Sequence, residues 1–279
     1  MAKLGREVGA AGFCFRSFGV RVGVRVNTPE LLDKIHQHLP PGWRPQRSPE
    51  VDRLYFFRAA VPDQRRGIKR LHLLFSNLEM LARTGDLDEF MKAFESDVNS
   101  YIAQAAGNRF FVHAGVVGWK GRAIVIPGRS FSGKTTLVSE FLKHGATYYS
   151  DEFAVFDRHG CVHFFPGPLG IRDGATYRQL RAPVHEFARK VGTHSLSVGF
   201  LLLTHYRQSA QWRPTACSPG KGMLSLLANS LSARQRPAET LRSLQKVVGG
   251  ATILEGARGE AASVVKSFLR RHKSGSLRF

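Results

Sequence analysis

The chain has 279 residues and carries 41 lysines and arginines against 21 aspartates and glutamates, a formal net charge of +20 at pH 7. This length suffices for one large domain or two modest ones. No apolar run approaches the roughly 18 residues of a membrane-spanning helix, and the cysteines are scattered without a CxxC pair, which favours free thiols in a reducing compartment (Cys14, Cys161 and Cys217). We therefore expect a cytoplasmic protein without a membrane partner.

The excess of positive charge does not by itself indicate nucleic acid as the main partner. Basic clusters occur at 65–66, 69–70 and 270–273, but they are spread along the chain. No signature of an RNA- or DNA-binding module accompanies them. The charge suits ATP or an acidic peptide as well as it suits nucleic acid.

The first part of the chain predicts strands and short helices. Residues 20–26 alternate valine with other residues and put Arg21 and Arg25 on the opposite face, which indicates a half-buried strand. Thr28 followed by Pro29 predicts the N-cap and first position of a short helix. The proline- and glycine-rich stretch 40–45 predicts a loop. Further strands are expected at 54–57 and 68–75.

A long amphipathic helix follows these strands. Asp86 and Glu89 have the spacing of a capping box. The apolar positions after them recur at helical intervals and predict a core-facing stripe, which comprises Leu87, Phe90, Met91, Phe94, Val98, Tyr101, Ile102 and Ala105. We therefore expect residues 1–107 to form a smaller α+β region.

Two apolar segments then lie close together in the chain. Residues 110–117 form one apolar run and residues 122–127 a second, separated by the turn residues 118–121. A parallel crossover needs about a dozen residues or more, so these segments must form an antiparallel hairpin.

The second strand of this hairpin leads into a phosphate-binding motif. Residues 128–135 match G-x-x-x-x-G-K-[ST], between a predicted strand and a helix predicted over 135–144. The glycines allow a tight turn whose N–H groups surround phosphate, while Lys134 supplies charge and Thr135 can ligate Mg²⁺. The expected nucleotide-binding residues are Gly128, Arg129, Ser130, Phe131, Ser132, Gly133, Lys134, Thr135 and Thr136.

Acidic residues close to this motif are the candidates for catalysis. Asp151 and Glu152 lie between two strand-like segments, and the apolar run 198–204 lacks the terminal aspartate of a Walker B motif. His113 lies in the apolar strand of the hairpin, where a histidine packed in the core is the alternative. Residues 159–163 contain two histidines and a cysteine, but alternation across a hairpin accounts for them better than metal binding.

The hairpin with His113-Ala114, the phosphate loop and the acidic pair together resemble the HPr kinase/phosphorylase family, over residues 108–173. The rest of the C-terminal part is similar to divergent HPr kinase-related proteins of peptide-modification pathways. The resemblance implies an α/β, phosphoenolpyruvate carboxykinase-like core with a mixed sheet over 108–279, including C-terminal helices. It also makes a small PqqD-like peptide chaperone a candidate partner and leaves a homo-oligomer open as an alternative to a monomer.

The family's roles are carried over by position. The resemblance implies Asp151 as the general base, Glu152 as the carboxylate on the metal side and His113 beside the phosphates, with the two acidic roles open to exchange. The metal-binding glutamate that precedes the family's Gly-Leu-Gly signature has no match in 164–172, where Arg172 is a candidate to stabilise the transferred phosphate. The first hundred residues do not resemble the family's N-terminal domain.

These features predict a kinase that uses ATP and Mg²⁺ to phosphorylate a serine of a peptide or protein. The alternative is a P-loop ATPase that acts as a nucleotide-dependent regulator or with nucleic acid and transfers no phosphate to protein. The fate of the γ-phosphate distinguishes the two.

Overall fold

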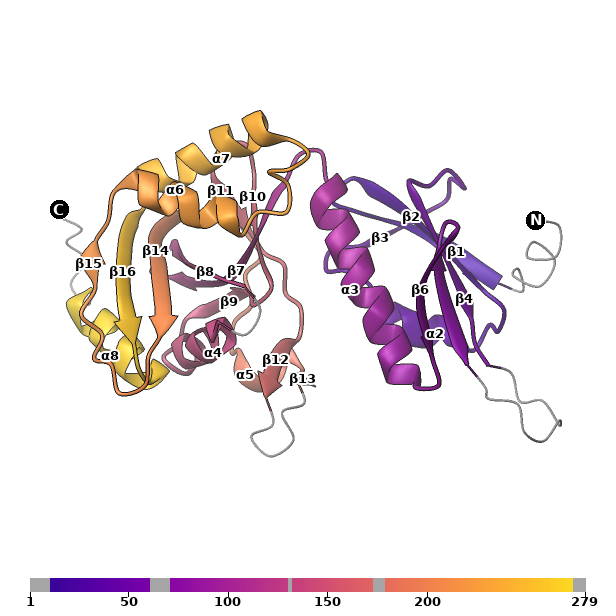
Figure 1. Cartoon of the computed structure of the whole chain (residues 1–279), viewed down its shortest axis with the longest axis horizontal. Helices are drawn as coiled ribbons and strands as arrows, with labels where there is room; N and C mark the ends of the chain where they lie inside the picture. Colours follow the sequence, from indigo (N-terminus) through magenta and orange to yellow (C-terminus); the bar gives the residue numbers. More distant parts are fainter. Residues whose placement is uncertain (1–10, 61–70, 130–131, 173–178, 273–279) are drawn as a thin grey trace. The chain divides into compact units, whose positions relative to one another are not determined.

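The computed structural model describes residues 11–60, 71–129, 132–172 and 179–272 (Figure 1). The chain divides into two compact units, unit 1 (Met1–Asn108) and unit 2 (Arg109–Phe279). Each unit builds its own mixed sheet, so the protein is of the mixed α/β type. The basic clusters at 65–66 and 69–70, and the start of the strand predicted at 68–75, lie outside the described residues.

The described strands of unit 1 form one sheet in the order β3-β1-β2-β4-β5-β6. Neighbouring strands are antiparallel except β2 and β4, which are parallel. The strands are β1 (Ala11–Ser17), β2 (Val20–Val26), β3 (Arg44–Gln46), β4 (Arg53–Arg58), β5 (His72–Ser76) and β6 (Glu79–Thr84).

Helix α3 (Leu87–Ala105) supplies the core on one face of this sheet, as its apolar stripe predicts. Phe94 packs edge-on against Tyr55 and Phe57, with ring centroids 5.1 and 4.9 Å apart. The Asp86 carboxylate caps the helix by accepting from the N–H groups of Asp88 and Glu89. The Glu89 carboxylate accepts from the Thr84 hydroxyl, whose oxygen in turn accepts from the Asp86 N–H.

Two local predictions in unit 1 are wrong. Helix α2 (Leu31–His36) begins with Glu30 at its N-cap, because a turn over Thr28 and Pro29 precedes it and accepts the first N–H groups. Part of the predicted 40–45 loop belongs to β3, where Pro45 pairs with Phe15. Proline is tolerated there because β3 is the edge strand of the sheet.

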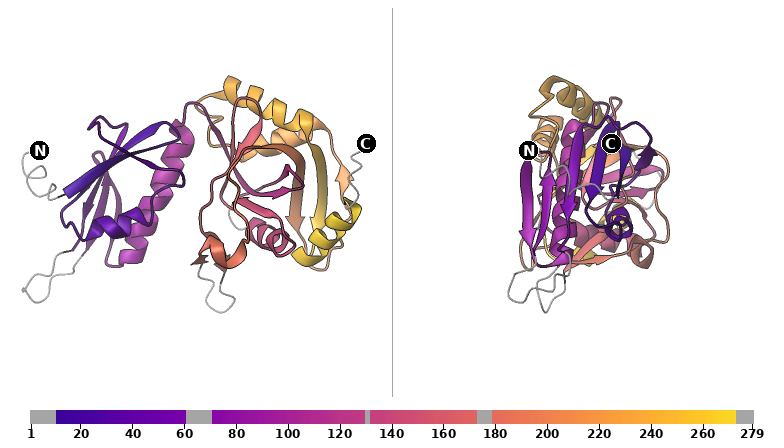
Figure 2. Two further views of the ribbon diagram at one scale, coloured as in Figure 1. Left: turned by 180° about the vertical axis from the view of Figure 1, so that it is seen from behind. Right: turned by 90° about the vertical axis from the view of Figure 1, so that its right-hand side faces the viewer.

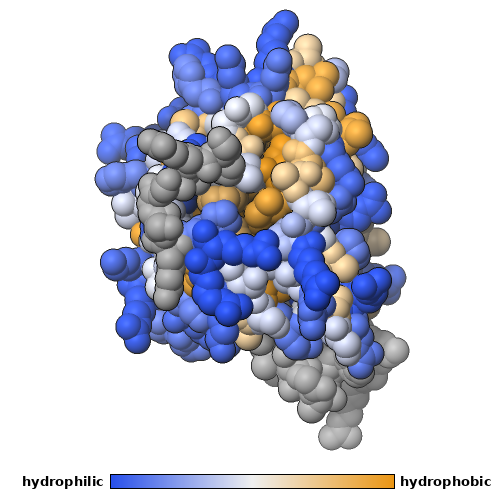
Figure 3. Space-filling model, turned by 90° about the vertical axis from the view of Figure 1, so that its left-hand side faces the viewer, coloured by the Kyte–Doolittle hydropathy of each residue, from blue (hydrophilic) through white to orange (hydrophobic). Residues whose placement is uncertain are grey.

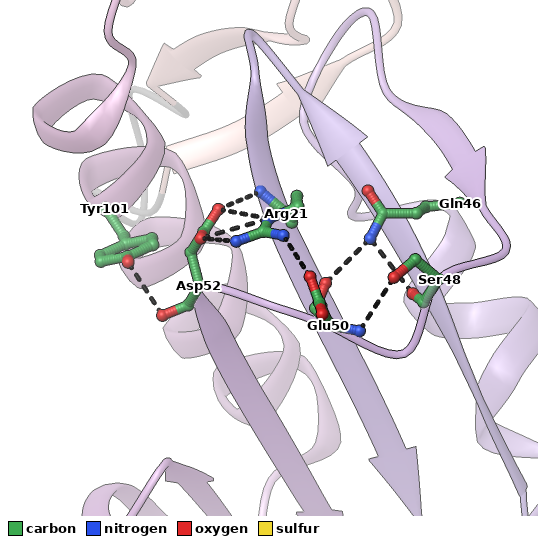
Figure 4. Close-up of polar contacts among 6 residues, drawn as sticks. All are labelled: Arg21, Gln46, Ser48, Glu50, Asp52 and Tyr101. Atoms are coloured by element: carbon green, nitrogen blue, oxygen red, sulfur yellow. Dashed lines mark hydrogen bonds and ion pairs between the residues drawn. The ribbon is translucent and has the colours of Figure 1, made fainter.

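The predicted arginine face of β2 is partly neutralised within unit 1. The Arg21 guanidinium donates to Asp52 at 2.7 Å and to Glu50 at 3.2 Å (Figure 4). These carboxylates lie in the connection between β3 and β4, which Tyr101 also contacts by donating to the Asp52 carbonyl. Arg21 therefore holds this connection in place.

The larger sheet of unit 2 has the strand order β11-β10-β7-β8-β14-β16-β15. Strand β9 also pairs with β7, and β12 and β13 form a separate two-stranded sheet. The strands are β7 (Phe110–Trp119), β8 (Arg122–Pro127), β9 (Thr147–Ser150), β10 (Phe153–Phe156), β11 (Cys161–His163), β12 (Leu169–Arg172), β13 (Gln179–Ala182), β14 (Leu196–Tyr206), β15 (Thr215–Ala216) and β16 (Thr252–Arg258).

Helices cover both faces of this sheet, as Figure 1 and the opposite view at the left of Figure 2 show. On one face α4 (Lys134–Lys143) and α8 (Ala261–Arg271) pack in a core with Ile124, Ile126 and Phe200. On the other face α6 (Pro219–Ala228) and α7 (Pro237–Gly250) pack in a core with Val125 and Leu201. The short helix α5 (Val184–Phe187) joins the α4 side. Strand β8 is therefore buried on both faces, which explains its continuous apolar sequence.

The predicted hairpin is confirmed, because β7 and β8 pair antiparallel over Ala114–Trp119 and Arg122–Pro127. On its other side β8 is parallel to β14, which is in turn parallel to β16. The carboxyl ends of β8, β14 and β16 consequently lie at the same edge of the sheet. Open α/β sheets bind ligands at this edge.

No helix in the described part of the chain is long and apolar enough to cross a membrane. On the face drawn in Figure 3, hydrophilic side chains border a band of apolar ones.

Candidate functional site

The 128–135 segment connects the end of β8 to the start of α4. The Gly128 N–H donates to the His113 carbonyl at 3.1 Å, which ties the segment to β7. Helix α4 starts at Lys134, one residue before the predicted start, and its N-cap Gly133 has the left-handed φ of 82°. Glycine adopts this conformation without the steric cost of a Cβ atom. Ser130 and Phe131, two expected binding residues, lie outside the described residues.

Lys134 is held against the loop that precedes it. Its side chain is buried, and Nζ donates to the Arg129 carbonyl at 2.7 Å. Burial lowers the pKa of Lys134, and the charges of Asp151 and Glu152 oppose this shift. The ammonium therefore lies inside the turn, where a phosphate surrounded by the loop would meet it.

Thr135 and Asp151 form the closest polar contact between the loop and the acidic pair. The Thr135 hydroxyl donates to Asp151 Oδ2 at 2.7 Å. Asp151 Oδ1 is buried and has no hydrogen-bond partner among the described residues, and the same is true of Ser132 Oγ. Buried polar atoms normally have partners, so these two atoms are available to a polar ligand.

An interrupted strand brings the acidic pair to this position. Strands β9 and β10 both pair with β7, and Asp151 and Glu152 lie between them, facing Ala114 and Gly115 of β7. The Ala114 N–H donates to the Glu152 carbonyl at 3.2 Å. The buried Ser150 hydroxyl accepts from the N–H groups of Glu152 and Phe153 at 3.2 and 3.0 Å.

Gly115 leaves the space that this arrangement needs. A Cβ atom there would lie 2.6 Å from Val138 Cγ2 on α4 and 4.0 Å from Asp151 Oδ1. Any larger residue would force Val138 or the backbone to shift at the point where the loop meets the acidic pair.

Burial shifts the pKa values of the two carboxyl groups and of the histidine. Burial raises the pKa of Asp151 to about 6, although the Thr135 hydroxyl and Lys134 oppose the shift. Glu152 reaches solvent but has protein on most sides, and this incomplete hydration together with the Asp151 charge raises its pKa to about 7. Burial and the Lys134 charge lower the pKa of His113, so its imidazole is neutral at pH 7.

His113 packs in the β7 strand beside Phe153, with ring centroids 4.9 Å apart. Its carbonyl accepts from Gly128 and its N–H donates to the Asn229 carbonyl. These contacts connect its backbone to the loop, and the Lys134 charge is near enough to help lower the pKa of its ring.

Sequence reasoning missed Arg258, the last residue of β16. Its guanidinium donates to the carbonyls of Ser132 and Gly133 at 3.3 and 3.1 Å. No local motif marks this arginine, since the contact joins residues 125 positions apart. Ser150 was missed for a similar reason, because its role depends on the break between β9 and β10.

Other candidate residues do not join the site. His163 Nε2 lies 2.9 Å from Asp157 Oδ2, which accounts for the 159–163 cluster as part of the β10–β11 turn. The Arg172 side chain lies outside what the structure describes.

The donor set fits Mg²⁺ with a nucleotide. Thr135 Oγ1 and Asp151 Oδ2 are neighbouring oxygen donors, and Asp151 Oδ1 lacks a partner. Within the described residues, no group of three or more His, Cys, Asp or Glu side chains could hold a metal ion. Mg²⁺ commonly binds through one or two protein oxygens together with substrate phosphates and water, which agrees with this arrangement.

Comparisons with known proteins give distant likenesses to solved structures. No family model and no curated protein matches the chain. Among solved structures, the Hpr(Ser) kinase/phosphatase from Coxiella burnetii is similar at 12% identity, over 58% of this chain and 95% of that one, with a TM-score of 0.35. A TM-score of this size decides neither the fold nor the function of the chain.

Proposed function

We propose that unit 2 is an ATP-dependent kinase that transfers the γ-phosphoryl group of Mg-ATP to a serine hydroxyl of a peptide or protein. The observation that supports this most directly is the 2.7 Å hydrogen bond from Thr135 to Asp151, beside the buried Lys134. Phosphoryl transfer requires positioned phosphates, neutralised charge and a carboxylate near the nucleophile. These residues can supply all three.

The loop and Lys134 hold the phosphates in this proposal. The N–H groups of the described loop residues and the N-terminus of α4 would bind the nucleotide phosphates, and the Lys134 ammonium would neutralise part of their charge. Thr135 and Asp151 would hold Mg²⁺, which supplies further charge neutralisation when it is bound.

Glu152 is then the better candidate for the base that receives the serine proton. Asp151 is engaged with Thr135, whereas Glu152 reaches solvent, where an acceptor can approach. A base with a pKa near 7 is well suited to proton transfer at neutral pH. The geometry therefore favours an exchange of the two roles that the family resemblance suggests.

The acceptor in this proposal is a serine of a peptide or protein, brought by a partner such as a small peptide chaperone of the PqqD type. The excess of basic residues favours an acidic substrate. Nucleic acid has no part in the proposed reaction.

The test is to incubate the full chain with γ-labelled ATP, Mg²⁺ and a bacterial peptide library. We expect label on phosphoserine, strongly reduced in Lys134→Ala and in Glu152→Gln. Release of labelled phosphate to water without any labelled peptide, especially if nucleic acid accelerates it, would contradict the kinase and favour the ATPase alternative.

A further inference from the structure

Arg258 lies behind the phosphate loop, at the carboxyl end of β16. Its side chain is only 3% exposed. Nη2 donates to the Ser132 and Gly133 carbonyls, and Nη1 donates to the Gly259 carbonyl at 3.2 Å. The guanidinium carbon lies 5.5 Å from the centre of the Tyr206 ring on β14.

Within the described residues this buried arginine makes no ion pair, and its Nε has no hydrogen-bond partner. Burial lowers its pKa. The Glu260 carboxylate acts on it from a longer distance and favours its charged form. Burying a charge without an ion-pair partner costs free energy of folding. Packing of the sheet against helix α8 could be achieved equally well by an apolar side chain at position 258, so packing alone does not account for an arginine there.

The hydrogen bonds of Arg258 fix the direction of two loop peptides. In a trans peptide the carbonyl and the N–H point to opposite sides. When Arg258 holds the carbonyls of Ser132 and Gly133 on its own side, the N–H groups of Gly133 and Lys134 must point away from it. Amides that are oriented before a phosphate arrives bind it without a further cost of reorganisation.

We propose that Arg258 is a positioning residue, which turns the Gly133 and Lys134 amides toward the nucleotide phosphates. The inference rests on the nucleotide-binding part of the proposed function and is independent of the phosphate acceptor. The position of Arg258 also gives a second reason why residue 133 is a glycine. A Cβ at this position would clash with Arg258 Nη2, in addition to the strain of its positive φ.

The sheet accounts for how this contact arises. Residues Tyr206 and Arg258 are register partners on the parallel strands β14 and β16. Since β8 is parallel to β14, the end of β16 lies at the edge where β8 enters the loop. The arginine can therefore reach the loop carbonyls from beneath, on the side opposite the proposed phosphate site.

The test compares Arg258→Gln and Arg258→Lys with Arg122→Gln in the full chain. Arg122 is a matched control, because its Nη2 also donates to two carbonyls, those of Val198 at 3.1 Å and Gly250 at 2.9 Å, at the opposite end of β8. The readouts are the Kd for Mg-ATP by calorimetry, the melting temperature without nucleotide, and amide hydrogen exchange over 132–135.

We expect Arg258→Gln to raise the Kd for Mg-ATP by roughly tenfold or more, the size of lost hydrogen bonds from a charged group. Arg258→Lys keeps the charge but loses the fork, so it should raise Kd several-fold and speed exchange at Gly133 and Lys134. Arg122→Gln should lower the melting temperature and leave Kd unchanged.

The outcomes separate the two hypotheses. A wild-type chain that binds no nucleotide refutes the proposed function itself. Suppose that the wild type binds ATP and Lys134→Ala does not. If the Arg258 variants then show the same Kd and the same amide exchange as the wild type, the proposed role of Arg258 is overturned. If Arg258→Gln does not fold, Arg258→Lys decides by the same two measurements.

Discussion

Asp151 has two oxygens in different surroundings, and this difference is central to the site. Oδ2 accepts from Thr135, while Oδ1 is buried without a described partner. Burial disfavours the charged form of this carboxyl group, and bound Mg²⁺ would stabilise that form by giving it a partner.

The raised pKa values predict opposite effects of pH on stability and on metal-nucleotide binding. The pKa of Asp151 rises from 3.8 to about 6 and that of Glu152 from 4.5 to about 7, so the folded protein binds more protons than the unfolded chain between these values. Stability without ligand should therefore fall as pH rises from about 4 to about 7, by at most about 3 kcal/mol from Asp151. The affinity for Mg-ATP should rise over the same range.

Thermal unfolding and calorimetry as a function of pH check this prediction. Asp151→Asn should flatten both profiles, since an amide cannot titrate. Parallel pH profiles for stability and Mg-ATP affinity in the wild type would contradict the coupling of the carboxyls to the metal.

Lys134 provides a second prediction at this scale. Lys134→Met removes a buried ammonium and keeps an unbranched apolar chain, so the unfolding free energy should not fall. The Kd for Mg-ATP should rise by about a hundredfold, because the buried ammonium that would contact the phosphates is lost. Denaturant unfolding and calorimetry measure the two effects. A large loss of stability with retained binding would assign Lys134 to the fold alone.

At the level of elements, the break between β9 and β10 delivers the acidic pair to the loop. Both strands continue along β7, and the Ser150 hydroxyl supports the break by accepting two backbone N–H groups. The same sheet places the carboxyl ends of β8 and β16 at one edge. The site is therefore built from strand ends on a sheet that is packed on both faces.

Ser150→Ala tests this role of the break. It leaves two N–H groups without their acceptor, which should cost about 1–3 kcal/mol of stability and should lower transfer activity by displacing Glu152. Ser232→Ala is the matched control, because Ser232 is also buried and accepts from the Phe111 N–H at 3.2 Å. Equal loss of activity in both variants, after correction for the fraction folded, would show that only stability is affected.

At the scale of the whole molecule, the two units have separate cores. Phe57 in unit 1 is fully buried and packs edge-on against Phe90 and Phe94. Phe141 in unit 2 is equally buried, on the helix that follows the phosphate loop. Nucleotide binding should therefore depend on the second core and not on the first.

Phe57→Ala should destabilise unit 1 by about 3–5 kcal/mol and leave the Kd for Mg-ATP unchanged. Phe141→Ala should destabilise unit 2 by a similar amount and weaken binding. Hydrogen exchange with and without Mg-ATP assigns the loss of protection to each unit. Loss of ATP binding in folded Phe57→Ala would contradict independent cores.

The sequence alone determined what depends on neighbouring residues. The 128–135 motif, the short turn between β7 and β8, and the periodicity of α3 are local signals, since turn length and helix spacing act over a few residues. The predicted start of α2 was wrong because the carbonyls of Thr28 and Pro29 form a turn and accept the first N–H groups of the helix.

Only the tertiary structure decided how distant residues meet. Ser150 acts through the break between two strands on β7, and Arg258 reaches Gly133 across 125 positions because parallel strands bring their carboxyl ends together. Such contacts leave no spacing in the sequence, because sheet pairing, and not chain distance, determines which side chains are neighbours.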